Sequence, residues 1–569
     1  MYRLAKTLLI AALFLFPGAG SVQGRDTAHV ELTYRPVTRS DGGFAAIDIA
    51  LRFPGSTDGV THINLPGEWG GFDQLYAQLS NFRAEGATLT TTANPMRMEL
   101  RHVPGAPILL RYRIENAGGS ERLTGSQIVN DYRPIVRPTY FHLIGDAVLA
   151  KPAHLPGETP ASFRIEAMPA GAAFASDLEH RALTLDKLVE SVAVGGDFRL
   201  IDAGGGARLA VRGRFDARDD HGWIDSFRKI AAASTGYWNS KTGPYLVTIL
   251  AFEPSGPGAT SIGGTGRGDA FAFFATTNAE PAFLDRIMAH EMAHSWVNGR
   301  IGGFAKEGPE AEQYWLSEGF TDFTSWRALA RSGFWTPEHY FGEFNTALAE
   351  YDRSPLRATP NAAAAALHWT DEDARKLAYQ RGMLIAHWAD HRLASQRRPR
   401  SMRNLLHVMQ ARGNPPGESA ITLFRKTANK YGLAIDAALA RFIGAGEPIP
   451  LPIDFLAACG TLKSFERPEF HRGFDIEATR SQGGTIAGVI EGSAAWRAGM
   501  RNGMKLIGRS GGEIGDSMTE IAYDVEDRGE KRTLRYLPQG SKMQTVRQFE
   551  TADLTTPDAR RRCIAALSR

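Results

Sequence analysis

Apolar and polar residues alternate in short runs through the first part of the chain. The runs at 30–34, 46–51 and 108–112 are separated by turns rich in Gly, Pro and Asn. Alternation with a period of two places one face of a strand in a core and the other face in solvent. The pattern predicts an antiparallel β domain over residues 25–170.

Helical spacing replaces this alternation in the middle of the chain. A continuous apolar run at 245–250 is typical of a buried strand. Pro281 suits a first helical position, and Gly299 suits a C-terminal cap. Helical patterns cover residues 222–236, 281–298, 402–409 and 420–431. We therefore expect a mainly helical domain over 171–455.

Short apolar runs and glycines return after this helical region. Residues 485–504 follow the order of a strand, a short helix and a turn. We expect a small domain over 463–545 and a C-terminal tail over 546–569. The fold class predicted for the whole chain is α+β and multidomain.

The first 24 residues have a different pattern. Arg3 and Lys6 precede an apolar run at 8–16, and small residues lead to Gly24. This order is typical of a secretory signal peptide. The run is much shorter than the roughly 20 residues that a membrane helix needs. We expect an exported protein, periplasmic or secreted, with no membrane span in the mature chain.

Composition narrows the classes of partner and predicts one crosslink. The 65 Lys and Arg residues nearly balance 62 Asp and Glu residues, so charge gives no reason to expect nucleic acid as a partner. The only two cysteines, Cys459 and Cys563, bracket the last domain. In an oxidising compartment they are expected to pair. Closing so long a loop removes about 4 kcal/mol of chain entropy from the unfolded state.

The strongest chemical signal is the sequence His290-Glu291-Met292-Ala293-His294. On a helix, residues four apart present two imidazoles to one point, and the intervening acid is placed to take a proton from a metal-bound water. Two surface histidines on a helix are the alternative interpretation. A second pair, His387 and His391, lacks an interposed acid and predicts no metal site.

A third ligand follows after a loop. Ser317 is expected to cap a new helix and to leave Glu318 in its exposed first turn. That carboxylate completes a His, His, Glu set, with a fourth position left for water, which predicts zinc as the cofactor. Asp322 lies one turn later, where it can accept the second N–H of a ligand histidine. A solvated helix Asp is the alternative.

These residues also carry a family resemblance. The segment resembles the gluzincin metallopeptidases and, within them, the glycyl-aminopeptidase-like family with a C-terminal PDZ domain. Residues 295–317 separate His294 from Glu318, a longer interval than in the aminopeptidase N family. The resemblance implies a thermolysin-like catalytic domain with one Zn²⁺ per chain. The matching residues are His290, Glu291, His294, Ser295, Trp296, Asn298, Arg300 and Ile301, then Trp315, Glu318, Gly319, Phe320, Thr321 and Asp322.

The same resemblance assigns two further parts of the catalytic site. The segment Tyr379-Gln380-Arg381-Gly382 is similar to the family's Tyr-x-Lys-Gly, which implies that the Tyr379 hydroxyl supports the oxyanion. Gly263 and Gly264 belong to a segment that corresponds to the substrate-binding strand of related peptidases. Aminopeptidases carry on it a Glu that captures the amino terminus. Asp269 can substitute for that Glu here, or it can be an ordinary turn residue.

The last domain resembles a PDZ domain. Arg472, Gly473 and Phe474 match the loop and strand that cradle a peptide carboxylate, so a peptide C-terminus is an expected partner. A purely structural β domain is the alternative.

Together the signals predict a zinc-dependent peptidase that acts on exported or extracellular peptides. The sequence leaves open whether attack is internal or at the amino end. A PDZ- and zinc-based peptide-binding protein without turnover is the alternative from another class. An aminopeptidase-N-like enzyme, which would use the same zinc chemistry, is a further alternative.

Overall fold

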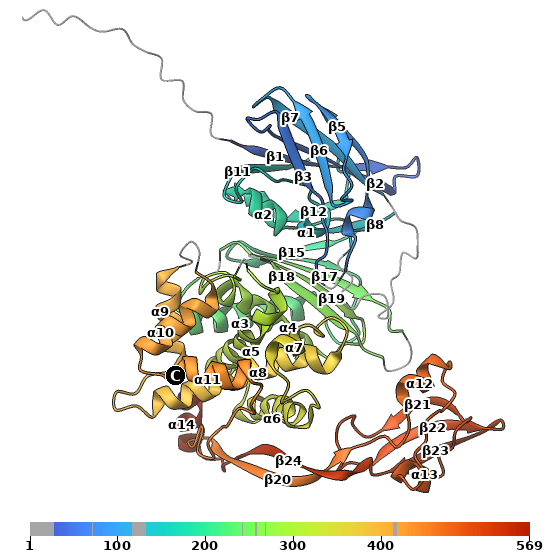
Figure 1. The fold of residues 1–569 in the computed structure, drawn as a ribbon, viewed down its shortest axis with the longest axis vertical. Helices are drawn as coiled ribbons and strands as arrows, with labels where there is room; N and C mark the ends of the chain where they lie inside the picture. Colours follow the sequence, from blue (N-terminus) through green and yellow to red (C-terminus); the bar gives the residue numbers. More distant parts are fainter. Residues whose placement is uncertain are drawn as a thin grey trace, which may run out of the picture.

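A computed structural model describes residues 28–70, 72–115, 133–180, 182–241, 243–255, 259–267, 269–305, 307–413 and 418–569. The β-rich N-terminal region lies above a sheet-and-helix region, and a long ribbon leads away to a small C-terminal module (Figure 1). The predicted signal peptide lies outside the described residues. Among the described residues, no helix is long and apolar enough to cross a membrane.

The N-terminal region consists of strands β1 to β14, which form three sheets. Short helices at 145–148 (α1) and 185–189 (α2) and 3-10 turns at 75–78 and 177–180 join them. The strands are β1 (Val30–Thr38), β2 (Phe44–Pro54), β3 (Val60–Asn64), β4 (Leu79–Glu85), β5 (Ala87–Thr91), β6 (Arg97–His102), β7 (Pro107–Glu115), β8 (Ile135–Arg137), β9 (Tyr140–Ile144), β10 (Lys151–Pro152), β11 (Pro160–Ile165), β12 (Ala173–Ser176), β13 (Leu183–Thr184) and β14 (Val192–Gly196).

Two pairings depart from the simple antiparallel picture. Strand β11 runs parallel to β1, with Val30 opposite Ala161. Strands β13 and β14 complete sheets of the same region, so its β structure continues to Gly196, past residue 170. Both features join segments far apart in the chain, which a local alternation pattern does not reveal.

A five-stranded sheet forms one layer of the catalytic region, in the order β15-β16-β17-β19-β18. Strand β17 pairs in parallel with both neighbours, β16 and β19, and this position explains its continuous apolar run. Strand β18 lies antiparallel at the edge. The strands are β15 (Arg199–Gly204), β16 (Ala207–Arg212), β17 (Leu246–Phe252), β18 (Ile262–Arg267) and β19 (Ala270–Thr276).

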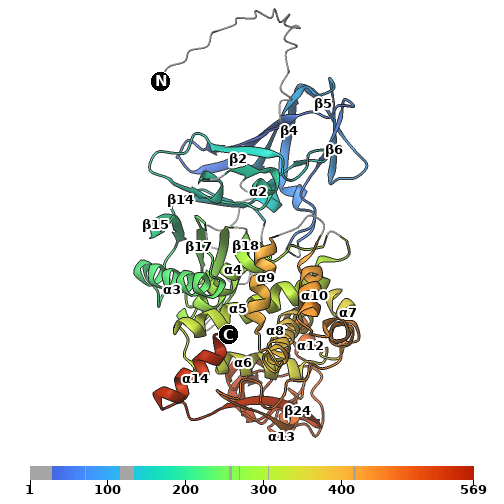
Figure 2. The ribbon, with the colours of Figure 1, turned by 90° about the vertical axis from the view of Figure 1, so that its left-hand side faces the viewer.

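Helices pack beneath this sheet and fill the centre of the molecule (Figure 2). Helix α4 begins at Pro281 and ends at Val297, close to its predicted bounds. Its Met292 and Trp296 share one large core with Phe320 of α5 and Leu384 of α8. The helices are α3 (Asp220–Trp238), α4 (Pro281–Val297), α5 (Tyr314–Ser332), α6 (Pro337–Arg353), α7 (Asn361–Ala365), α8 (Glu372–Ala394), α9 (Met402–Arg412), α10 (Ala420–Lys430) and α11 (Ile435–Leu439), with a 3-10 turn at 310–313 and a π-helical turn at 440–444.

The C-terminal module is held at the end of a two-stranded ribbon. The ribbon strands β20 (Gly460–Phe470) and β24 (Gln539–Thr551) are antiparallel, and they extend beyond both limits of the predicted domain at 463–545. The module between them has its own core, which includes Phe474 and Ile486. Its elements are α12 (Ile476–Ser481), α13 (Ala494–Arg497), β21 (Lys505–Gly511), β22 (Ile521–Asp527) and β23 (Glu530–Tyr536).

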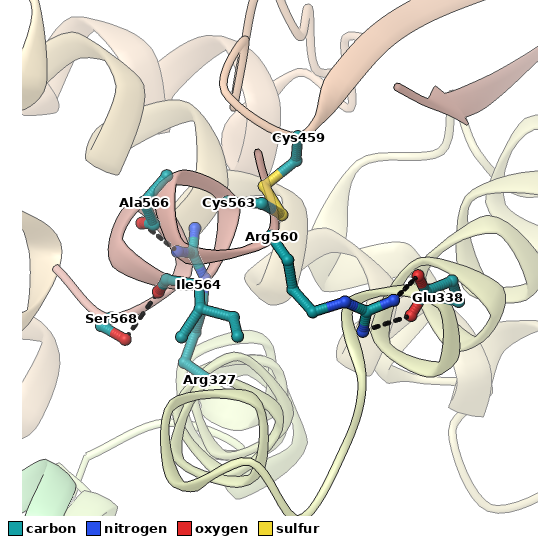
Figure 3. Close-up of a disulfide and its surroundings, with 8 residues drawn as sticks. All are labelled: Arg327, Glu338, Cys459, Arg560, Cys563, Ile564, Ala566 and Ser568. Atoms are coloured by element: carbon teal, nitrogen blue, oxygen red, sulfur yellow. Dashed lines mark hydrogen bonds and ion pairs between the residues drawn. A yellow bond between two sulfur atoms is a disulfide. The ribbon is translucent and has the colours of Figure 1, made fainter. Parts of the chain in front are cut away.

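The segment expected to be a tail is a docked helix, α14 (Pro557–Leu567). Cys563 is joined by a disulfide to Cys459 at the start of the ribbon, and both are fully buried in the catalytic core (Figure 3). The guanidinium of Arg327 donates to the Ala566 carbonyl at 3.1 Å. Arg560 forms an ion pair of 2.6 Å with Glu338. The end of the chain therefore returns to the catalytic region and fixes the base of the ribbon there.

Candidate metal centre

Helix α4 presents His290 and His294 on one face, because they are one turn apart. Their ring centroids are 4.9 Å apart. His290 is 5 % exposed, and nonpolar residues of the same helix are buried against the core. The interpretation of the two histidines as surface residues is therefore wrong.

Glu318 of α5 completes the cluster. Its Oε2 atom lies 3.1 Å from His290 Nε2 and 3.5 Å from His294 Nε2. One donor atom from each of the three residues lies within 4.8 Å of the others. A tetrahedral zinc ion with bonds of about 2.0 Å separates its donor atoms by about 3.3 Å, so the set fits such an ion.

Each histidine makes a second hydrogen bond that fixes its ring. His290 Nδ1 lies 2.8 Å from Asp322 Oδ1, as expected for an outer carboxylate. His294 Nδ1 lies 3.3 Å from Thr321 Oγ1, whose own proton is donated to the Ser317 carbonyl. Both Nδ1 atoms therefore donate hydrogen bonds. The lone pair of each Nε2 atom is then available to bind a metal.

Ser317 has a different role from the predicted helix cap. Helix α5 begins three residues earlier, at Tyr314, so Glu318 lies in its second turn and its side chain is only 15 % exposed. The Ser317 hydroxyl donates to Glu318 Oε1 at 3.0 Å and accepts from Asn298 Nδ2 at 2.9 Å. This chain of hydrogen bonds orients the third ligand from the end of α4. Asn298, Ser317 and Thr321 lay within the motif, yet sequence reasoning did not give them these roles.

The charges within the cluster are strongly coupled. Burial disfavours the charged form of His290, but Asp322, Glu318 and Glu291 outweigh it and raise the pKa of its imidazole well above the usual value. Burial also opposes ionisation of Glu318, yet His294 and His290 hold its pKa well below the usual value. A dication placed among these groups would compete with protons for the same lone pairs.

Glu291 lies against the edge strand β18. Burial raises the pKa of its carboxyl, while the charges of His294 and His290 and the backbone N–H of Gly266 favour ionisation. A Cβ atom at Gly266 would stand 3.1 Å from Glu291 Oε2 and 3.3 Å from His294 Cβ. The glycine therefore lets the strand pass close to the reacting groups.

The other predicted residues of this strand are placed differently. Gly263 and Gly264 lie in β18, which is an edge strand of the five-stranded sheet among the described residues and pairs there with β19. A Cβ at Gly264 would come within 2.5 Å of the Phe271 ring. Asp269 occupies the turn after β18, where its carbonyl accepts from Leu246, and it is not part of the metal-ligand set. The backbone therefore supports the interpretation of Asp269 as an ordinary turn residue.

Tyr379 reaches the site because helices α5 and α8 cross at two glycines. A Cβ at Gly319 would stand 2.4 Å from the Gly382 Cα, and one at Gly382 would stand 1.5 Å from the Trp315 carbonyl oxygen. The crossing brings the Tyr379 ring over His290, with 5.7 Å between ring centroids and 29° between planes. The glycine after Gln380-Arg381 thus sets the approach of the two helices.

Arg381, which stands where the family has Lys, is a structural residue in this chain. It is 1 % exposed, and its guanidinium donates to the carbonyls of Arg357 and Thr359. His387 is also structural, since it is buried between Tyr340 and Arg327 and burial lowers its pKa well below the usual value.

The residues of the predicted carboxylate loop make contacts inside the C-terminal module. The Gly473 N–H donates to the His471 ring at 3.0 Å, and the Asp475 N–H donates to the Ala487 carbonyl at 3.0 Å. The Asp475 side chain accepts from Ala478 N and starts helix α12 where a peptide-binding strand was expected. Phe474 is buried in the module core, and the Arg472 carbonyl accepts from Tyr536. Helix α12 therefore follows the motif directly, and the Gly473 N–H is engaged inside the module.

Comparison with known proteins agrees with this architecture. The family model of the M61 glycyl aminopeptidases matches residues 284–386, which include all three ligands and Tyr379. The crystal structure of an aminopeptidase N family protein from Idiomarina loihiensis superposes with a TM-score of 0.65 at 15% identity and covers 94% of this chain and 100% of that one. No curated protein matches the chain.

Two weaker structural matches were also found. A mutant of a two-domain M1 zinc metallopeptidase bound to L-arginine has a TM-score of 0.45 at 15% identity, covering 74% of this chain and 94% of that one. Yeast LTA4 hydrolase in complex with bestatin has a TM-score of 0.47 at 13% identity, covering 78% of this chain and 73% of that one.

The first of the three structures shows a shared mixed α and β fold, with an N-terminal β region and a helical region. The family match falls on the segment that carries the His, His, Glu set. Together they identify the chain as an enzyme, a hydrolase of the metallopeptidase class.

Proposed function

We propose that this protein is a zinc-dependent peptidase that hydrolyses peptide bonds with a metal-activated water. The observation that carries the proposal is the convergence of His290, His294 and Glu318, each held by an outer hydrogen bond. Two nitrogen donors and one carboxylate are a donor set that zinc prefers and that leaves a coordination position open. We infer one Zn²⁺ per chain.

When bound, zinc supplies Lewis acidity, which lowers the pKa of a coordinated water towards about 7 and polarises the scissile carbonyl. Glu291 lies next to this position and accepts the proton of the water, then passes it to the leaving amine. The Gly266 N–H helps to keep that carboxylate ionised before the transfer. The Tyr379 phenol, over the His290 ring, stabilises the oxyanion of the tetrahedral intermediate.

The position of β18 as an edge strand beside Glu291, within the described residues, supports an extended peptide as the substrate. We propose an aminopeptidase or oligopeptidase that acts on exported or extracellular peptides, and a periplasmic or secreted location. The buried Cys459–Cys563 disulfide supports an oxidising compartment. The N-terminal pattern of residues 1–24 supports export.

For the C-terminal module we propose a structural role in place of the expected binding of a peptide C-terminus. The short helix α13 supports a PDZ-like origin, and the Gly473 N–H, which donates to the His471 ring, favours a structural function. We propose that it does not capture a peptide carboxylate at Arg472, Gly473 and Phe474.

The test is a comparison of the wild type with Glu291→Gln. The variant should keep its zinc, measured by elemental mass spectrometry, and lose at least about a thousandfold in kcat, because no base remains to take the water proton. Free and N-acetylated versions of one peptide, read by mass spectrometry, report whether cleavage needs a free amine.

Two results would reject the proposal. Full activity of the variant would exclude Glu291 as the base. Peptide binding by a zinc-loaded wild type that releases no products would favour the non-catalytic alternative.

A further inference from the structure

A partly exposed group of aromatic rings comes from the segment before α5, the first residue of α5 and the turn before α8. We call Phe304, Tyr314, His368 and Trp369 the aromatic rim. Tyr314 is at its centre, with ring centroids 6.0 Å from Phe304, 4.8 Å from His368 and 6.2 Å from Trp369. His368 and Trp369 are 4.8 Å apart and nearly perpendicular. The four rings are therefore one packed unit.

The aromatic rim is next to the metal centre. Tyr314 precedes Glu318 by four residues on α5, so both lie on the same side of that helix. His368 packs on Tyr314, with 4.8 Å between ring centroids, so the rim begins one turn of α5 from Glu318. A side chain that follows or precedes the scissile bond of a bound peptide would therefore meet these rings.

The rim also carries no charge near neutral pH. Burial lowers the pKa of His368 to about 4, so its imidazole is neutral. Burial and the neighbouring carboxylates of Glu310, Glu318 and Glu68 raise the pKa of Tyr314, whose hydroxyl donates to Glu310 at 3.0 Å. The faces offered to a ligand are thus those of uncharged rings.

Part of the rim is exposed to solvent. Phe304 is 37% exposed and Trp369 is 40% exposed, and Leu367 beside them is 41% exposed. Single exposed apolar side chains are ordinary, but a contiguous aromatic group beside a reaction centre is typical of a ligand subsite.

We propose that the aromatic rim is a substrate subsite that binds an apolar, preferably aromatic, side chain next to the scissile peptide bond. The inference rests on the proposed peptidase function and adds a preference to it. Contact between aromatic rings, beyond the area that they bury, improves binding by about threefold to tenfold.

The experiment measures binding without turnover. The zinc-loaded Glu291→Gln protein is titrated by calorimetry with tetra-alanine and with four versions that carry one Phe at each position, both free and N-acetylated. The same titrations are made after adding Trp369→Ala. Phe283→Ala is the matched control, because Phe283 is a partly exposed aromatic residue, 37% exposed, at the start of α4.

We expect Phe at one position to tighten Kd by about threefold to tenfold over Ala. Trp369→Ala should reduce this factor to below about twofold and leave the Kd of tetra-alanine unchanged, whereas Phe283→Ala should leave both unchanged. The subsite is rejected if no position favours Phe, if no peptide binds, or if both variants behave alike. If the wild type cleaves none of the peptides while the predicted binding pattern holds, the peptidase proposal fails and the subsite stands.

Discussion

The metal centre and the C-terminal module were both predicted from short motifs, but the residues of the two motifs are arranged differently in the structure. At the metal centre, the side chains of the motif converge, and Asp322, Thr321 and Ser317 hold the three ligands in place. In the C-terminal module, the residues of the motif are present, but the Gly473 N–H donates to the His471 ring and helix α12 begins two residues after Phe474.

The difference follows from which atoms do the binding. Two imidazoles one turn apart on a helix share a direction whatever surrounds them, because the helix period fixes it. A carboxylate cradle is made of backbone N–H groups, so it depends on local dihedral angles and on which carbonyls compete for those groups. A side-chain motif is therefore stronger evidence for a site than a backbone motif of equal length.

The largest effect is expected at the crossing of helices α5 and α8, which brings Tyr379 to the metal centre. Gly382→Ala puts a Cβ against the Trp315 carbonyl oxygen, and backbone cannot move aside as a flexible side chain can. We expect a loss of about 4 kcal/mol or more in the free energy of unfolding, measured by denaturant titration. Gly342→Ala in α6 is the control, since its added Cβ has no neighbour within 4 Å. Equal stability of the two variants would show that the crossing is not tight.

The second test separates the attachment of the C-terminal module from the chemistry. Cys563→Ala opens a loop closed over a sequence separation of 104 residues and should lower the free energy of unfolding by about 2–4 kcal/mol. Because the disulfide joins α14 to the start of the ribbon and the three ligands come from α4 and α5, zinc content and kcat at 25 °C should stay within about twofold of wild type. A large loss of kcat in a variant that remains folded at that temperature would couple the ribbon to the metal centre.

A smaller effect is expected from the outer hydrogen bonds. Asp322→Ala removes the acceptor that orients His290 and should weaken zinc binding by about tenfold to a hundredfold, measured by competition with a chelator. Asp225→Ala on the exposed face of α3 removes only a surface pair with Lys229 and is the control. Unchanged zinc affinity in Asp322→Ala would remove that carboxylate from the site.

The smallest effect is expected at the C-terminal module. Peptides with a free C-terminal carboxylate and their amidated versions should bind the Glu291→Gln protein with affinities within about twofold of each other, since the Gly473 N–H already donates to the His471 ring. A Phe474→Ala variant is unsuitable here because it opens the module core. A strong preference for the free carboxylate that persists after His294 is replaced would show that the C-terminal module binds a peptide carboxylate.

The sequence by itself determined those features that depend on short-range periodicity and side-chain chemistry. The bounds of α4, the shared direction of His290 and His294, and the buried strand β17 follow from spacing within one element. Glu318 and Asp322 were also found from the sequence, because they share one face of the next helix. Each of these inferences needs contacts only within a turn or two of the chain.

Only the tertiary structure decided the remaining features, because each depends on a partner far away in the sequence. The pairing of β1 with β11, the approach of Gly319 to Gly382 and the return of α14 to the catalytic core leave no periodic signal. The same holds for Ser317, whose hydroxyl is directed by Asn298 and not by a helix end. Packing between distant segments fixes these positions, and no local propensity encodes which segments will meet.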